Sequence, residues 1–250
     1  MVSQSSEDVQ SPLLNQSSSQ YHTSHDIPRE VTPSQHCKIP TPTGPTEFNM
    51  AFVSFLLASS GVFLFAGTVW YITYNAPYIL FIWHPTLMAL TLFMSTFGIL
   101  VLQTTAKQGE KNVGLNWHKL FQSVAFIAVI AGFSIIITFK NQHNKDHFTS
   151  AHGKAGVFTF SYLLIQAIFG SILVNFPGVV GGRSKAVGMY KYHRFSGYFL
   201  LVLIYITALG GTQSDWTREQ FNHIWVWLLA IVLVGVGVAT RAKSSKLKIW

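Results

Sequence analysis

Four histidines of this chain, His84, His118, His152 and His193, have types and spacings that could support metal chemistry. Each lies in the first turn or so of a separate long apolar run, at intervals of 34, 34 and 41 residues (118 − 84, 152 − 118 and 193 − 152). If the runs cross a membrane, successive runs point in opposite directions. His84 and His152 then share one face, and His118 and His193 share the other. Two imidazoles at the same depth on neighbouring helices are the axial ligands that a six-coordinate haem iron needs.

Zinc and haem are the two metal groups to weigh against each other. Zinc takes four nitrogen or sulfur ligands, or three and a water molecule. Here the faces separate the histidines two and two, and the apolar runs contain no Cys, Asp or Glu to complete a set. Haem needs only two axial groups, because the porphyrin supplies four nitrogens. One interfacial histidine needs no special role, but four at matching depth indicate a function. The alternative is a six-span transporter that uses the histidines for a proton or divalent metal pathway.

The residues beside the histidines are compatible with a haem pocket. Glycines at positions 153, 156 and 197 would let a flat macrocycle approach a helix backbone, although glycine also serves ordinary close packing between membrane helices. Four basic side chains could pair with haem propionates or, alternatively, with lipid headgroups. They are Lys119, Lys154, Lys191 and Arg194.

Composition and hydropathy predict the elements that position these residues. Of 250 residues, 49% are apolar and 10% are charged, whereas soluble globular chains carry about 25% charged residues. Six apolar runs are each near the roughly 20 residues that cross a bilayer as a helix. They cover approximately residues 49–73, 83–103, 117–139, 152–176, 190–210 and 222–240. The predicted fold class is therefore an all-α integral membrane protein with six transmembrane helices.

Charge asymmetry predicts the orientation of the helices. The net charge is +8, but the basic residues flank the apolar runs, which favours membrane topology over nucleic-acid binding. Basic residues concentrate before the first run, in the second and fourth connections and after the last run; only the third connection runs against this pattern. Both termini, His118 and His193 are then cytosolic. We predict a disordered cytosolic tail over 1–47, a transmembrane domain over 48–241 and a basic cytosolic tail over 242–250.

Short motifs in the same order resemble the eukaryotic cytochrome b561 family, whose members are ascorbate-linked transmembrane electron carriers. The resemblance covers roughly residues 50–240. It rests on Trp83-His84-Pro85, His118 with Gln122, Phe148-Thr149-Ser150-Ala151-His152-Gly153, Gln166 with Gly170, Pro177-Gly178, and Tyr192-His193 with Gly197. The best-known members commonly carry Ser-Trp after the third ligand, where this chain has Gly153-Lys154. The chain is therefore more similar to the short b561-domain proteins.

The resemblance implies a fold and a function. The second to fifth helices would form a four-helix bundle around two b-type haems, one bound by His84 and His152 and the other by His118 and His193. Electrons would pass from cytosolic ascorbate to monodehydroascorbate or a ferric chelate on the opposite face. Homodimers are usual in the family. We expect an endomembrane location, such as a vacuole, a lysosome-like compartment or the ER, with the plasma membrane as the alternative.

The implied substrates suggest where binding residues lie. Ascorbate is an anion, so its site should be basic. The cytosolic candidates are Lys107, Lys111, Arg183 and Lys185, although these residues also enforce topology. On the opposite face His147 is the candidate for contacting an anionic acceptor or chelated iron.

Overall fold

The structure of the chain is a computed structural model that describes residues 45–103, 105 and 107–242, with side chains from Met50 onward. The predicted N-terminal tail up to residue 44, and the predicted basic tail beyond Ala242, lie outside the described residues.

Helices make up all the regular structure of the described residues. They are α1 (Pro45–Asn75), η1 (Leu80–Ile82), α2 (Trp83–Gln103), α3 (Gln108–Gln142), α4 (Ala151–Asn175), η2 (Pro177–Val180), α5 (Arg183–Thr212), α6 (Asp215–Gln220) and α7 (Ile224–Arg241). Within the described ranges, α1 to α5 and α7 are long and apolar enough to cross a membrane. The predicted all-α class with six membrane-spanning helices is confirmed.

Two helices begin well before the positions predicted from hydropathy. α3 begins at Gln108 instead of about 117, and α5 begins at Arg183 instead of about 190. Residues 108–116, which lie between the predicted runs 83–103 and 117–139, are therefore part of α3. At its start the Lys107 backbone N–H donates to Glu110 Oε2 (3.2 Å), and a carboxylate in the first turn favours a helix N-terminus.

The physical reason for this difference is that hydropathy marks only the apolar part of a helix. Backbone hydrogen bonds continue through polar residues beyond the bilayer core as long as no residue breaks the helix. α6 is a second example, because it lies between the predicted runs 190–210 and 222–240. Its first turn is stabilised by Ser214, whose hydroxyl accepts from the Thr217 backbone N–H (3.4 Å).

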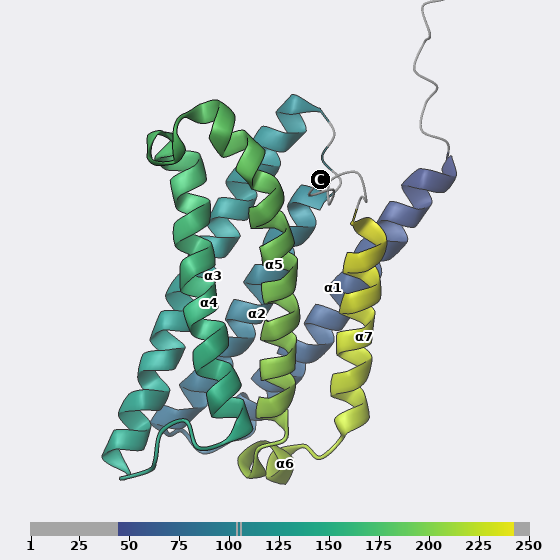
Figure 1. The fold of residues 1–250 in the computed structure, drawn as a ribbon. Helices are drawn as coiled ribbons and strands as arrows, with labels where there is room; N and C mark the ends of the chain where they lie inside the picture. Colours follow the sequence, from purple (N-terminus) through teal and green to yellow (C-terminus); the bar gives the residue numbers. More distant parts are fainter. Residues whose placement is uncertain (1–44, 104, 106, 243–250) are drawn as a thin grey trace, which may run out of the picture. The chain divides into compact units, whose positions relative to one another are not determined.

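The second to fifth long helices form a ring. α2 packs along α3 and α4 packs along α5, while contacts between α3 and α4 and between α2 and α5 complete the ring. α1 and α7 pack against each other, α1 also contacts α2, and α7 also contacts α5 (Figure 1). The four-helix bundle expected from the family resemblance is thus present, with the outer pair beside it.

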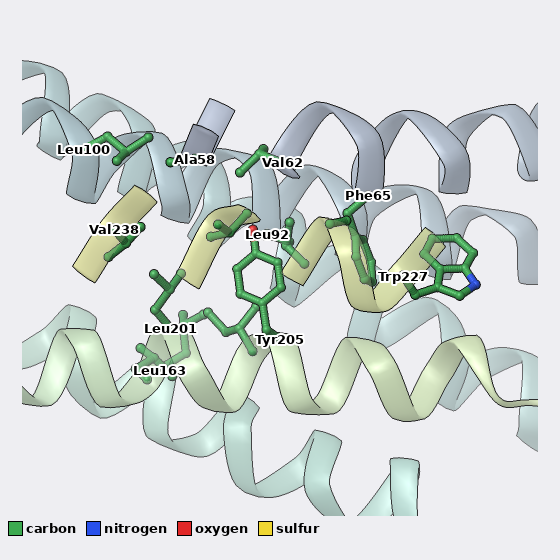
Figure 2. Packing of buried hydrophobic residues seen from close by; sticks show 14 of the residues in the cluster. Ala58, Val62, Phe65, Leu92, Leu100, Leu163, Leu201, Tyr205, Trp227 and Val238 are labelled. Carbon is green, nitrogen blue, oxygen red and sulfur yellow. The ribbon is translucent and has the colours of Figure 1, made fainter. Parts of the chain in front are cut away.

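The buried apolar cluster joins the outer pair to the bundle, with members from α1 to α5 and α7. Figure 2 shows part of it, with labelled side chains from α1, α2, α4, α5 and α7. The labelled members are Ala58, Val62, Phe65, Leu92, Leu100, Leu163, Leu201, Tyr205, Trp227 and Val238. Trp227 and Leu92 are almost completely buried, at 0% and 1% exposed. This core holds α2 and α5 in place, and each of them carries one histidine of interest.

Arg241 joins the end of α7 to two other helices, and we predict that it stabilises the fold. Its Nη1 donates to the Ala51 carbonyl (2.6 Å), its Nη2 to the Leu100 carbonyl (3.4 Å) and its Nε to Gln103 Oε1 (3.3 Å). Hydrogen bonds from charged donors contribute about 1.5–3 kcal/mol each, so Arg241→Leu should cost about 2–4 kcal/mol. Thermal unfolding in detergent measures this loss as a lower Tm.

Two further variants make that test specific. Arg241→Lys keeps the charge but not the planar fork of donors, so it should recover less than half of the loss. Arg218→Leu replaces an exposed arginine of α6 and should leave the Tm unchanged. An Arg241→Leu protein that unfolds at the wild-type temperature would contradict the assignment.

Candidate functional site

The bundle brings the four histidines together as two pairs. His84 on α2 lies beside His152 on α4, with 6.3 Å between the ring centroids and 75° between the ring planes. His118 on α3 lies beside His193 on α5, with a separation of 6.4 Å and an angle of 87°. Both pairs join helices that are diagonal in the ring, so the rings meet in its interior.

The separation within each pair matches that of two axial ligands on one metal ion. An imidazole nitrogen binds a transition metal at about 2.0 Å and the ring centre lies roughly 1.1 Å further on, so two opposed ligands place their ring centres about 6.2 Å apart. The observed 6.3 and 6.4 Å agree with this value. Among the described residues no three His, Cys, Asp or Glu side chains converge to hold a metal ion. Within the described part of the chain, each pair thus consists of two imidazoles that no third such side chain joins.

Backbone carbonyls set the proton position of three imidazoles. Nδ1 of His84 lies 2.9 Å from the Gly132 carbonyl oxygen, Nδ1 of His118 lies 2.7 Å from that of Gly98, and Nδ1 of His152 lies 2.9 Å from that of Thr207. A carbonyl oxygen can only accept a hydrogen bond, so Nδ1 carries the proton and donates it. The lone pair is then on Nε2, where it can bind a metal ion.

The fourth imidazole has a different neighbour. Nδ1 of His193 lies 3.1 Å from Nε2 of Gln166 on α4. The same amide nitrogen donates to the His193 carbonyl (2.7 Å), and Gln166 Oε1 accepts from the Ser196 hydroxyl (2.7 Å). His193 is thus held by a side chain, whereas the other three imidazoles contact the backbone.

A spacing of 14 residues organises these contacts. Each long helix of the ring carries a histidine and, 14 residues later, the residue that contacts the Nδ1 of another histidine. The four combinations are His84 with Gly98, His118 with Gly132, His152 with Gln166, and His193 with Thr207 (98 − 84, 132 − 118, 166 − 152 and 207 − 193). Fourteen residues are close to four helical turns and rise about 21 Å, so the two pairs occupy two levels roughly 21 Å apart.

Two glycines give the imidazoles room. A Cβ atom on Gly170 would lie 2.7 Å from His193 Cε1, and one on Gly211 would lie 3.0 Å from His152 Cε1. The glycines considered from the sequence lie elsewhere. Gly153 faces Ser150 and Phe148 at the start of α4, where Ser150 caps the helix, and a Cβ atom on Gly197 would lie 3.2 Å from Gln166 Nε2.

The four basic residues beside the histidines remain at the helix surfaces or at their margins. Lys119 and Lys154 are exposed, and Lys191 and Arg194 are partly buried. Lys191 Nζ lies 5.0 Å from the centroid of the Tyr192 ring, a cation–π distance. All four lie within one or two residues of a histidine in the sequence.

The sequence candidates for substrate binding fall at the two ends of the bundle. Lys107, Lys111, Arg183 and Lys185 are exposed at the starts of α3 and α5, three turns or less beyond the level of His118 and His193. Lys111 precedes His118 by 7 residues, so it shares the His118 face of α3, and Lys107 is the residue just before the helix. His147 lies in the connection between α3 and α4, where its Nε2 contacts Asn141 Oδ1 (2.8 Å).

The sequence analysis assigned no role to the residues that position the imidazoles. These are Gly98, Gly132, Thr207 and Gln166, together with Gly170 and Gly211, which adjoin the rings. The 14-residue offset from each histidine is the signal that could have identified four of them. Two residues 14 apart lie on the same face of a helix. When the first is a histidine of one pair, the second lies at the level of the other pair.

Known proteins are similar to this chain over the same segment. The family model of eukaryotic cytochrome b561 matches residues 83–219, which contain α2 to α5. A mouse protein named transmembrane reductase CYB561D2 is 28% identical over 141 residues, which are 55% of this chain and 63% of that protein. An Arabidopsis thaliana protein named transmembrane ascorbate ferrireductase 2 is 26% identical over 141 residues, 56% of this chain and 60% of that protein. The matched segment thus spans less than two thirds of the length of these relatives.

Proposed function

The chain belongs to the eukaryotic cytochrome b561 family, and from that premise we propose that it carries electrons across a membrane through two b-type haems. His84 and His152 bind one haem, and His118 and His193 bind the other. The electron donor is ascorbate on the cytosolic side, and the acceptor is monodehydroascorbate or a ferric chelate on the opposite side. The protein is thus a transmembrane ascorbate-dependent oxidoreductase.

The observation that carries this proposal is the geometry of the two histidine pairs. Ring centroids 6.3 and 6.4 Å apart suit two axial ligands of one iron. Gly170 and Gly211 supply the space beside the rings that a larger residue would fill. The residues present therefore fit the haem that a cytochrome family implies. When bound, a haem supplies an iron that accepts and releases one electron at a time.

The protein residues direct this chemistry. The two imidazoles of each pair would hold the iron of a bound haem, and a site supplied with two protein ligands would favour electron transfer over oxygen chemistry. The Nδ1–H donors of His84, His118 and His152 fix the ring orientations through backbone carbonyls. The apolar helices exclude water from both levels. Ascorbate loses one electron and one proton to become monodehydroascorbate, and a ferric chelate gains one electron to become ferrous.

Basic residues provide the contacts for anions. Basic residues at the starts of α3 and α5 attract ascorbate to the cytosolic end of the bundle; they are Lys107, Lys111, Arg183 and Lys185. His147 contacts the acceptor at the other end. The basic residues that adjoin the histidines would pair with the propionates of a bound haem; they are Lys119, Lys154, Lys191 and Arg194.

The surroundings of the protein complete the proposal. The positive-inside rule places both termini in the cytosol and the His118 and His193 level on the cytosolic side. We assign the chain to an endomembrane and expect homodimers, as the family resemblance implies. Two relatives, a transmembrane reductase and a transmembrane ascorbate ferrireductase, support the reductase class.

The visible spectrum of the detergent-purified protein tests this function. We expect a Soret band, two haem b per chain by quantification, and sharp α-bands when ascorbate is added. A folded but colourless protein, with bound zinc or no metal, would refute the haem proposal. A proton or metal flux in reconstituted vesicles would then identify the six-span transporter instead.

A further inference from the structure

The residue one turn after each histidine contacts the neighbouring helix at a fixed position. Four positions after its histidine, each long helix of the ring lies against the residue that follows the neighbouring helix's histidine by 14 positions. The four contacts are Met88 with Gly132, Gln122 with Gly98, Gly156 with Thr207, and Gly197 with Gln166. A side chain on one helix is thus matched each time by a glycine on the other, which lets membrane helices approach closely.

The contacts between α2 and α3 are the closest of the four. A Cβ atom on Gly98 would lie 2.5 Å from Gln122 Nε2, and one on Gly132 would lie 2.8 Å from Met88 Cε. In the contacts between α4 and α5 the corresponding distances are 3.2 and 3.9 Å. Both glycines of the closer contacts are buried. A larger residue at either position would therefore displace the side chain opposite it.

Gly98 of α2 is held from two sides by α3. Its carbonyl oxygen, which points towards the C-terminus of α2, accepts from His118 Nδ1 (2.7 Å). Its Cβ atom would point towards the N-terminus of α2, and Gln122 covers that side. The amide of Gln122 is fixed there because its nitrogen donates to the Ser95 carbonyl (3.2 Å). His118 and Gln122, one turn apart, therefore enclose one glycine of the neighbouring helix.

Gly132 of α3 is held in the same way by α2. Its carbonyl oxygen accepts from His84 Nδ1 (2.9 Å), and Met88, one turn after His84, covers the other side of the glycine. Met88 is apolar, so its contact with the glycine is one of van der Waals packing. The two helices thus carry the same arrangement twice, once at each histidine level.

We propose that Gln122 and Met88 are positioning residues: by packing against a glycine of the other helix, each keeps the carbonyl of that glycine on the imidazole one turn away. This inference rests on the proposed function. A carbonyl that accepts from Nδ1–H orients a metal-bound imidazole and makes it more basic, and loss of such a partner costs about 10–100-fold in metal affinity. Gln122 acts on the haem that His118 binds, and Met88 acts on the haem that His84 binds.

Gln122→Ala and Met88→Ala test the inference as a crossed pair, because each removes one packing contact and leaves all four histidines in place. Gln122→Ala should lower the affinity for the haem of His118 by about 3–10-fold and raise its reduction potential, since a less basic imidazole stabilises the oxidised iron less. The other haem should keep its wild-type values. Met88→Ala should give the same changes in the haem of His84 alone. Competition with apomyoglobin measures the affinities, and redox titration at the α-bands measures the potentials.

A double-mutant cycle shows whether the two residues of one contact act together. Gly98→Ala adds a methyl group where Gln122 packs, so it should weaken binding of the haem of His118 by about tenfold. In the Gln122→Ala background the same substitution should cost less than about threefold, because the space is then free. Equal costs in the two backgrounds would overturn the inference. If Gly98→Ala does not fold, the crossed pair still decides.

The crossed pair has two outcomes that contradict the positioning role. A change of both haems in either single variant would show a general loosening of the bundle. Unchanged haems in both variants would show that the glycines alone set the contact with the imidazoles. A wild-type protein without haem would instead refute the proposed function, and haem quantification of the wild type separates these two failures.

Discussion

Replacing His118 or His152 by alanine should leave a folded protein with one haem instead of two. Each histidine belongs to one pair only, and the two levels are about 21 Å apart along the helices, so loss of one axial ligand should not disturb the other pair. Haem quantification per chain measures the first effect. The His118→Ala and His152→Ala proteins should each lose a different α-band component.

The two variants should differ in their response to ascorbate. The His152→Ala protein keeps the pair that we assign to the cytosolic side, so ascorbate should still reduce its haem at close to the wild-type rate. In the His118→Ala protein, reduction by ascorbate from the cytosolic side should be slower by about 100-fold or more, since the loss of even a supporting contact costs 10–100-fold. Stopped-flow spectroscopy of vesicles with known orientation measures both rates.

His223→Ala is the control for these variants. His223 is exposed at the start of α7 and lies outside both pairs, so its replacement should leave two haems. Two haems in the His118→Ala protein would show that this residue is no ligand. Complete loss of haem from both single variants would show that the two sites are not independent.

Gly170→Ala should weaken binding of the haem held by His118 and His193 although it adds only one methyl group. The new Cβ atom would lie 2.7 Å from Cε1, 3.2 Å from Nε2 and 3.4 Å from Nδ1 of His193. Contact below 3.0 Å forces the ring to move, and a ring bound to both iron and Gln166 has little freedom to do so. We expect the affinity for this haem to fall by at least tenfold, with the other haem retained.

Gly188→Ala provides the matched control for this substitution. Gly188 lies in α5, and a Cβ atom there would meet no neighbouring atom within 4 Å. Alanine is the better helix former by about 1 kcal/mol, so this variant should keep both haems and equal or exceed the wild type in stability. Competition with apomyoglobin for haem compares the affinities. Wild-type haem retention in the Gly170→Ala protein would mean that the His193 ring can shift without cost.

Much of the fold follows from composition along the chain. Apolar runs of about 20 residues predict membrane helices because a bilayer accepts only backbone whose polar groups are satisfied within the segment. The same rule could not locate the ends of α3 and α5, which continue into polar residues beyond the apolar core. Nor could it predict α6, a single short helix that depends on the Ser214 cap more than on hydropathy.

The histidine pairs were predicted from position in the sequence, and their supports were not. Alternating helix direction requires His84 and His152 to share one level, and His118 and His193 to share the other. The residues beside the rings depend on how far each helix is rotated about its axis. Gly170 and Gly211 face imidazoles, whereas Gly153, equally plausible from the sequence, faces the α4 cap.

The sequence by itself therefore determined the class of the protein, its six membrane helices and the two-and-two division of the histidines, because these depend on composition and on the alternation of direction along one chain. Only the tertiary structure decided which helices contact each imidazole: α2 and α3 each contact the histidine of the other, and so do α4 and α5. It also decided that His193 contacts a side-chain amide, whereas the other three imidazoles contact backbone carbonyls. Those contacts depend on which helices are neighbours and on their relative rotation, to which hydropathy is insensitive.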